Sequence, residues 1–325
     1  MSSKKTSGSF DRDMNYIPDR IAADGEWPVE PDKYRLVVAH ACPWANRAWI
    51  THRLLGLDKA ISVAVAGPVH DASSWNFHLD DDELDPVLGV HKLQEAFFNR
   101  YPDYPRGITV PAIVDIESIS VVTNDFPVIE EELSTEWTAH HRPGAPDLWP
   151  DALRDEMEEV MEGVFHDVNN GVYKSGFAST QAAHEEAYDA LFDRLDWLEE
   201  RLATRRFLMG DTITQADIRL WPTLIRFDAV YHNHFKCNRN KISEMPALYG
   251  YTRDLFQTPG FGDTIDFPNI KAHYYQVHTG INPTGVTPKG PDVSDLSAPH
   301  GREALSAKSP FGDGTAPPLG NPNGS

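Results

Sequence analysis

The apolar positions in the first third of the chain form short runs separated by one helix-like stretch. The run over 34–39 has β-branched residues at its centre and indicates a buried strand. The segment 45–57 reads as a helix that ends near Gly56, and 61–65 indicates a second strand. Downstream, the pattern predicts a helix and then a hairpin of two strands, over 91–99, 107–115 and 118–122. The expected order is therefore a β-α-β unit, a helix and a β-hairpin.

Beyond a turn-rich stretch the apolar positions follow a helical period. Along 151–164 they recur at every third or fourth residue, and along 182–202 alanines and leucines share one face. Further helices are expected near 215–232 and 245–257, and this half has no strand signal of comparable strength. The predicted fold class is an α/β, thioredoxin-like domain followed by an all-helical domain.

These patterns divide the chain into five parts. They are an N-terminal arm (1–30), a thioredoxin-like domain (31–133), a linker (134–150), an all-helical domain (151–290) and a tail (291–325). The arm is polar and rich in turns, and we expect it to lie over the surface. Glycine, proline and serine dominate the tail, which has too little apolar surface to order itself, so we expect it to be disordered.

The formal net charge of −20 narrows the possible partners. Such a charge repels nucleic acid phosphates and anionic lipid, so we expect neither nucleic acid nor a membrane as a partner. No apolar run reaches the ~18 residues of a membrane helix. The polar first residues have no signal-peptide pattern. Two cysteines exclude a disulfide scaffold and favour the reducing cytoplasm.

Cys42 is the strongest candidate for chemistry. It follows the first buried strand and precedes Pro43, a residue type favoured at the first position of a helix. A sulfur at a helix N-terminus meets free amides and the positive end of the dipole, which predicts a lowered pKa and a reactive thiolate. Ala45 stands where a Cys-x-x-Cys motif has its second cysteine, so an external thiol must release the attacking sulfur. The alternative is a buried, inert cysteine under a helix cap.

The second cysteine, Cys237, has a less specific setting. It could resolve a disulfide, although a cysteine at such a place is more often a small core or loop residue. Neither cysteine has the clustered cysteine and histidine neighbours of a metal site, so we expect no metal. Thr214 and Asp217 have the spacing of a capping box, which predicts a helix start and a structural role.

Several tyrosines stand in polar surroundings and allow two interpretations. Each could be a core or interface aromatic whose hydroxyl is satisfied by a neighbour. Alternatively, a phenol could give a proton to a leaving carbon or form an aromatic wall for a ring substrate. The residues concerned are Tyr173, Tyr231, Tyr274 and Tyr275.

Together these motifs resemble the glutathione transferase superfamily and, more narrowly, the glutathionyl-hydroquinone reductases, or Xi class. The domain order and the Thr214-x-x-Asp217 pattern are similar to the superfamily as a whole. The narrower resemblance covers roughly residues 10–290 and depends on several segments. These segments are 41–45, 109–111, 170–178, 226–231, 234–238, 273–275 and 281–285.

The resemblance implies a mechanism and a homodimer. In that mechanism the thiolate of Cys42 attacks the sulfur of a thiol–hydroquinone conjugate, the hydroquinone leaves, and a second thiol releases the mixed disulfide. The resemblance also implies that Trp75 lies beside the thiol, that Pro111 is a cis-proline, and that the Val110 backbone pairs with the thiol. The substrate side would be lined by Tyr173, Tyr231 and Tyr274.

The chain departs from the family pattern where the thiol would be held. Gln94 stands where the family has an arginine, and Asp125 and Phe126 stand where it has the Glu-Ser pair that holds the γ-glutamyl group. These changes remove donors for the carboxylates of glutathione, and a buried carboxylate without partners costs several kcal/mol. We therefore expect a thiol other than glutathione, such as the sugar thiol mycothiol.

Two other functions stay open. A glutaredoxin-like thiol-disulfide reductase would share Cys42 and differ only in acting on small mixed disulfides. A non-catalytic, transferase-like binding protein would lose nothing when Cys42 is replaced by serine. Assays with both substrate types and the Cys42→Ser variant separate the three functions.

Overall fold

The computed structural model describes residues 3–6 and 8–319 and has a four-stranded mixed sheet in its first half. The strands follow the order β4-β3-β5-β6, with β3 parallel to β4 and antiparallel to β5. Leu36 of β3 pairs with Val63 on one side and Ile113 on the other, so β3 is central and buried along its length. The strands are β3 (Tyr34–Val38), β4 (Ile61–Val65), β5 (Ala112–Asp115) and β6 (Ser120–Thr123).

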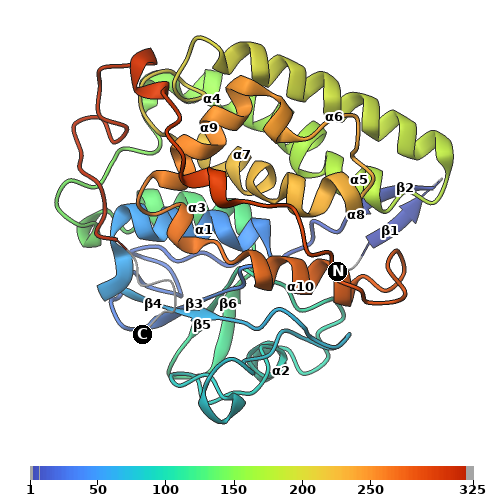
Figure 1. The fold of residues 1–325 in the computed structure, drawn as a ribbon. Helices are drawn as coiled ribbons and strands as arrows, with labels where there is room; N and C mark the ends of the chain where they lie inside the picture. The colour runs from blue at the N-terminus through green and yellow to red at the C-terminus, as the bar shows by residue number, and fades with distance from the viewer. Residues whose placement is uncertain (1–2, 7, 320–325) are drawn as a thin grey trace.

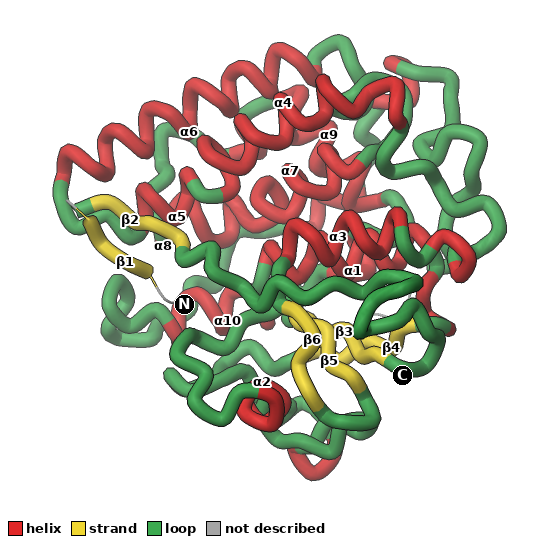
Figure 2. Tube along the Cα trace, turned by 180° about the vertical axis from the view of Figure 1, so that it is seen from behind, coloured by secondary structure: helices red, strands yellow, loops and turns green. Residues whose placement is uncertain are grey.

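Helices cover both faces of this sheet. On one face α1 (Pro43–Leu55) and α3 (Phe126–Thr135) pack against each other, and α1 also contacts α7 of the helical half. On the other face α2 (Gln94–Arg100) packs against β6. Figures 1 and 2 show α1 and α3 between the sheet and the helical half, and α2 on the far side of the sheet. This is the predicted thioredoxin-like architecture.

The second half is helical in the described residues, as predicted. Its longest helix, α6, has one apolar face buried and begins at a threonine cap, Thr180. The capping box of Thr214 and Asp217 is present at the start of the buried helix α7. The α-helices are α4 (Arg154–Gly163), α5 (Gly171–Gly176), α6 (Gln181–Leu202), α7 (Gln215–Arg226), α8 (His232–His234), α9 (Pro246–Gln257) and α10 (Phe267–Val277).

Short helical turns connect these elements. Two π-helical segments, Val164–Asn169 and Phe227–Tyr231, continue α4 and α7. The 3₁₀ turns are Leu57–Lys59, Asp81–Glu83, Thr138–His140, Asp151–Leu153, Ile242–Glu244, Gly262–Thr264, Ser294–Ser297 and Arg302–Leu305. Among the described residues, no helix combines the length and apolarity required to cross a membrane.

The N-terminal arm is more structured than its polar sequence suggests. Strands β1 (Ser3–Thr6) and β2 (Ser9–Arg12) form an antiparallel hairpin beside α5. Phe10, Ile17 and Ile21 are buried, so the arm is attached to the rest of the protein by apolar side chains.

The described part of the tail differs from the expected disorder. Residues 291–319 run along the helical half and then toward the sheet (Figure 1). Leu296 and Phe311 are buried, and the guanidinium of Arg302 donates hydrogen bonds to main-chain carbonyl groups. The acceptors are Leu202, Arg205, Arg206 and Ala247. A few anchors therefore order a mostly polar segment, because the surface that receives them is already built. Residues 320–325 lie outside the described residues.

Candidate active site

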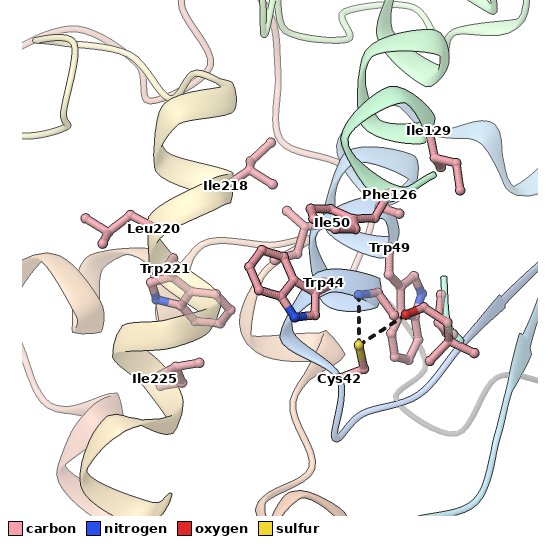
Figure 3. Close-up of a cluster of buried hydrophobic side chains, with 14 of the residues drawn as sticks. Cys42, Trp44, Trp49, Ile50, Phe126, Ile129, Ile218, Leu220, Trp221 and Ile225 are labelled. Carbon is pink, nitrogen blue, oxygen red and sulfur yellow. Dashed lines mark hydrogen bonds between the residues drawn. The ribbon is translucent and has the colours of Figure 1, made fainter. Parts of the chain in front are cut away.

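Cys42 lies at the N-cap of α1, as its sequence setting predicts. Its backbone is extended, and Pro43 takes the first position of the helix. The amide of Ala45 donates to the sulfur at 3.4 Å, and the thiol donates to the carbonyl oxygen of Val110 at 3.3 Å. Figure 3 shows both contacts as dashed lines, with the nitrogen-bearing edge of the Trp44 indole turned toward the cysteine. The sulfur is thus held between a helix N-terminus and the loop before β5.

The prediction of a lowered pKa at Cys42 is wrong for this state of the protein. Burial raises the pKa of the thiol above its usual value, although the amides of Ala45 and Trp44 and the charges of Arg226 and Arg12 lower it in part. The side chain is 7% exposed, so loss of hydration outweighs the helix N-terminus. The hydrogen bond from the thiol to Val110 agrees with a protonated sulfur. The free protein therefore holds Cys42 mainly as the thiol at neutral pH.

A cavity of about 620 Å³ opens beside Cys42. Both halves of the chain and the N-terminal arm contribute to its wall, and nine of its twenty residues carry an aromatic ring, histidines included. Its lining residues are Phe10, Arg12, Tyr16, Cys42, Trp44, His70, Asp71, Ala72, Trp75, Ile108, Thr109, Val110, Asn124, Phe126, Phe177, His273, Gln276, Val277, His278 and Thr279. The volume is large enough for a ring compound joined to a small thiol.

The structure brings some of the predicted thiol-binding residues to this cavity. Trp75 and Val110 line it with Cys42, and the Val110–Pro111 peptide bond is cis, as the resemblance implied. Among the described lining residues neither Gln94 nor Asp125 occurs. The backbone amide of Gln94 donates to the hydroxyl of Ser74, and the carboxylate of Asp125 lies 3.3 Å from the guanidinium of Arg20. The predicted contacts of these two residues with the thiol stay predictions.

Trp75 is part of a stack of neutral rings. Its indole lies nearly parallel to the His273 imidazole, with 5.0 Å between ring centres and an angle of 12°. The Nδ1 atom of His273 lies 2.9 Å from the carbonyl oxygen of Pro68, which fits an Nδ1–H donor. Burial lowers the pKa of His273 to about 3, so this imidazole is neutral at physiological pH. The stack forms a flat, uncharged wall against which an aromatic substrate can lie.

The structure brings the three tyrosines together, but behind the cavity wall. The hydroxyl of Tyr274 lies 2.6 Å from that of Tyr173 and 2.9 Å from that of Tyr231. All three are buried, and burial raises the pKa of each phenol. Tyr173 packs against two aromatic residues of the lining, Phe10 and Phe177. The phenols are neutral, and none of them lines the cavity among the described residues.

Cys237 is enclosed in the helical half. Its side chain is fully buried, and its sulfur lies 3.8 Å from the Phe235 carbonyl oxygen and 4.0 Å from that of Val172. Burial raises the pKa of this thiol to about 12. In the part of the chain that the structure describes, no group of three or more histidine, cysteine or acidic side chains is placed to hold a metal ion.

The sequence interpretation missed the contribution of the arm to the site. Phe10 and Arg12 on β2 line the cavity, and Arg12 lies over the Trp44 ring at 4.4 Å. The available signal was the alternation of polar and larger residues through Ser9, Phe10, Asp11 and Arg12, which is the period of a strand. The arm is therefore part of the active-site wall.

A thioredoxin-like domain with one cysteine at a helix N-terminus, followed by a helical domain, defines a thiol transferase of the glutathione transferase type. Comparison with known proteins supports this class. Residues 181–274 match the family described as glutathione S-transferase, C-terminal domain. The chain is 38% identical to glutathionyl-hydroquinone reductase YqjG of Escherichia coli, over 92% of this chain and 94% of that protein.

Solved structures agree with the sequence match. A glutathione transferase from Gordonia bronchialis is 58% identical, with a TM-score of 0.93, over 94% of this chain and 96% of that one. The glutathione-bound structure of YqjG from Escherichia coli is 38% identical, with a TM-score of 0.83, over 88% and 96%. The chain belongs to the glutathionyl-hydroquinone reductase family, the Xi class of glutathione transferases, and is a thiol-dependent reductase.

Proposed function

We propose that this enzyme uses Cys42 to remove a low-molecular-weight thiol from thiol–hydroquinone conjugates. The observation that supports the proposal best is a single cysteine at a helix N-terminus beside a cavity with aromatic walls. First, Cys42 forms a disulfide with the sulfur of the conjugate, the carbon–sulfur bond breaks, and the ring carbon takes a proton. A second thiol then attacks the mixed disulfide, releases Cys42 and forms a symmetrical disulfide. The two thiols supply the two electrons that reduce the ring.

We expect the Cys42 thiol to lose its proton when the substrate binds, rather than in the free enzyme. The thiol of Cys42 donates to the Val110 carbonyl in the free protein. A bound thiol compound that uses this carbonyl, as the resemblance implies, displaces the Cys42 proton from its acceptor. The sulfur then keeps the amide of Ala45 as a partner, and an amide donor favours the thiolate. The active thiolate is therefore expected in the complex rather than in the free enzyme.

The three buried tyrosines are the proposed proton source for the ring carbon. Their hydroxyl groups are neutral and linked, so a proton given by one can be replaced through its neighbours. Phe10 and Phe177 stand between Tyr173 and the cavity. We propose that these rings move when a conjugate binds, which brings Tyr173 within reach of the substrate.

Two observations point to different thiols as the co-substrate. The relatives carry glutathione in their names, which favours glutathione, and the comparisons give no support to mycothiol. The described lining has one arginine, Arg12, and one carboxylate, Asp71, beside its histidines. Glutathione has two carboxylates, so this lining fits a thiol with fewer negative charges, as mycothiol has. Both thiols therefore belong in the assay.

The decisive experiment supplies one hydroquinone as its glutathione conjugate and as its mycothiol conjugate. The expected products are the free hydroquinone and the symmetrical disulfide of the matching thiol, separated by chromatography. Intact-mass spectrometry of Cys237→Ala protein should show a mixed disulfide on Cys42 when the second thiol is withheld. Absence of both the adduct and free hydroquinone with either conjugate would overturn the proposed function.

The resemblance also supports a cytoplasmic homodimer as a proposal. Light scattering during size-exclusion chromatography should give twice the chain mass of 36.4 kDa. A single-chain mass at working enzyme concentration would contradict the dimer and leave the chemistry of Cys42 untouched.

A further inference from the structure

Two buried hydrogen-bond donors beside Cys42 have no partner. Among the described residues, Nη2 of Arg12 and the indole Nε1 of Trp44 make no hydrogen bond, and both side chains line the cavity that holds the sulfur. A buried donor without a partner costs about 1–3 kcal/mol. Both nitrogens are covered in the free protein, so a ligand acceptor pairs with them once the neighbouring side chains of the cavity wall move. We propose that Arg12 and Trp44 together bind the hydroquinone oxygen that becomes negative when the carbon–sulfur bond breaks.

The position of Arg12 is fixed by contacts on three sides. Its Nε donates to the side-chain oxygen of Asn170 at 2.7 Å. Its guanidinium carbon lies 4.4 Å from the ring centre of Trp44 and 4.8 Å from that of Tyr173. Stacking and one hydrogen bond thus hold the guanidinium while Nη2 stays unpaired. A donor held in this way does not have to reorganise when charge develops next to it.

A second cation makes the N–H of the Trp44 indole a stronger hydrogen-bond donor. The guanidinium of Arg47 lies 4.5 Å from the Trp44 ring centre. Arg47 is buried and is held by the side chain of Asn169 at 2.6 Å and the carbonyl of Arg219 at 3.0 Å. A cation close to an indole ring draws electron density from it and makes its N–H a better donor. Trp44 therefore lies beside two guanidinium groups, those of Arg12 and Arg47, and their positive potential favours an anion at its N–H.

The hydroquinone leaving group requires donors for a negatively charged oxygen. This step of the inference rests on the proposed function. A carbanion on an aromatic ring is a poor leaving group. In the keto tautomer the carbon that bears sulfur has taken a proton from the tyrosine network, which recovers one from the neighbouring hydroxyl group of the ring. When Cys42 takes the sulfur, the electron pair of the carbon–sulfur bond forms a ring double bond, and the carbonyl becomes a phenolate. The phenolate then takes one proton from solvent, which gives the hydroquinone.

Other polar groups near the cavity are less suited to this role. The three tyrosine hydroxyls already bond to one another and lie behind the wall. His273 and His278 are in contact with each other and with aromatic rings, and His273 already faces the carbonyl of Pro68. Asp71 is an acceptor and would repel an oxyanion. Among the described residues of the lining, the buried donors without a partner are those of Arg12 and Trp44.

The test compares two substrates that carry the same thiol. One is the thiol–hydroquinone conjugate and the other is a small mixed disulfide of that thiol, whose leaving group is a thiolate. Arg12→Met keeps the length of the stem and removes the charge and the donors. We expect kcat/KM for the conjugate to fall by on the order of 100-fold, and that for the mixed disulfide to fall by less than about fivefold. Arg106→Met is the matched control, because Arg106 lies outside the cavity lining and pairs with Asp13.

Two further measurements keep the proposal open to contradiction if Arg12→Met folds poorly. Trp44→Phe retains an aromatic ring without the N–H, and we expect about a tenfold loss confined to the conjugate. With chlorinated, more acidic hydroquinones the loss in either variant should shrink, because a more stable phenolate depends less on the donors.

Equal losses for both substrates would overturn the inference, because they would assign Arg12 to binding the thiol or to the Cys42 thiolate. A loss that does not change with hydroquinone acidity would also overturn it. Failure of the wild-type enzyme to act on any conjugate would instead contradict the proposed function.

Discussion

The two cysteines of this chain are both buried, and burial raises the pKa of both thiols, yet they differ in access to a cavity and in their position relative to a helix N-terminus. Cys42 caps a helix, receives a hydrogen bond from Ala45 and borders a cavity of about 620 Å³. Cys237 is fully enclosed, and its sulfur lies against the carbonyl oxygens of Phe235 and Val172. Carbonyl oxygens stabilise a protonated thiol and disfavour a thiolate. Access to the cavity and the helix N-terminus, rather than low burial, therefore make Cys42 the proposed nucleophile.

The largest expected effect is the difference in turnover between variants of Cys42 and of Cys237. Replacing Cys42 with serine should reduce conjugate turnover by roughly 10⁴-fold or more, because the nucleophile is lost. Replacing Cys237 with alanine should leave turnover within about twofold, because no substrate reaches that sulfur. Steady-state kinetics on both variants provides the measurement. Comparable losses in the two variants would show that Cys237 takes part in the chemistry.

A smaller effect concerns the reactivity of the two thiols in the free enzyme. Burial raises the pKa of Cys42, so the thiolate fraction is small at neutral pH and grows with pH. Alkylation by iodoacetamide should therefore accelerate about tenfold per pH unit between pH 7 and 9. The adduct should lie on Cys42 alone, as peptide mass spectrometry would show, with Cys237→Ala as the control. A rate that is flat above pH 6 would mean that the thiolate already dominates in the free protein.

The smallest effect concerns the arm that walls the Cys42 cavity. Glu132 of α3 accepts a hydrogen bond from the Ile21 amide of the arm, and burial raises its pKa to about 7. The folded protein thus binds this proton more tightly than the unfolded chain, so stability falls as pH rises from about 4.5 to 7. Glu132→Gln should raise the free energy of unfolding by about 1–2 kcal/mol at pH 8 and leave it unchanged near pH 4.

Urea unfolding at the two pH values measures this effect. Glu131→Gln is the control, because Glu131 is an exposed neighbour on the same helix. An equal gain for Glu132→Gln at both pH values would show that the raised pKa is not its cause.

Local sequence rules predicted the framework around Cys42. A buried strand followed by Cys42-Pro43 predicts a helix N-cap, and the capping box at Thr214 and Asp217 predicts the start of α7, because both depend on neighbours in sequence. The pKa of Cys42 could not be predicted in this way, because its burial depends on Val110 and on segments far along the chain.

Long-range docking explains the other differences. The tail is mostly polar, but Arg302 finds several carbonyl acceptors on a surface made by other helices. Arg12 lies in a segment whose composition indicates an arm. It is held in the cavity wall by Trp44 and Asn170, which are far from it in the sequence. The family resemblance implied that the tyrosines line the substrate side, and the structure places them one layer behind the cavity wall.

The cavity wall combines β2 with α10, which are far apart along the chain, and this has a consequence for biosynthesis. Cys42 emerges from the ribosome early, but residues near His273 emerge only after most of the helical half has been made. At about 5–20 residues per second, this interval lasts on the order of ten seconds or more. During it the nascent thiol has neither its cavity nor its full burial, so newly made chains meet oxidants with a more exposed sulfur than finished enzyme.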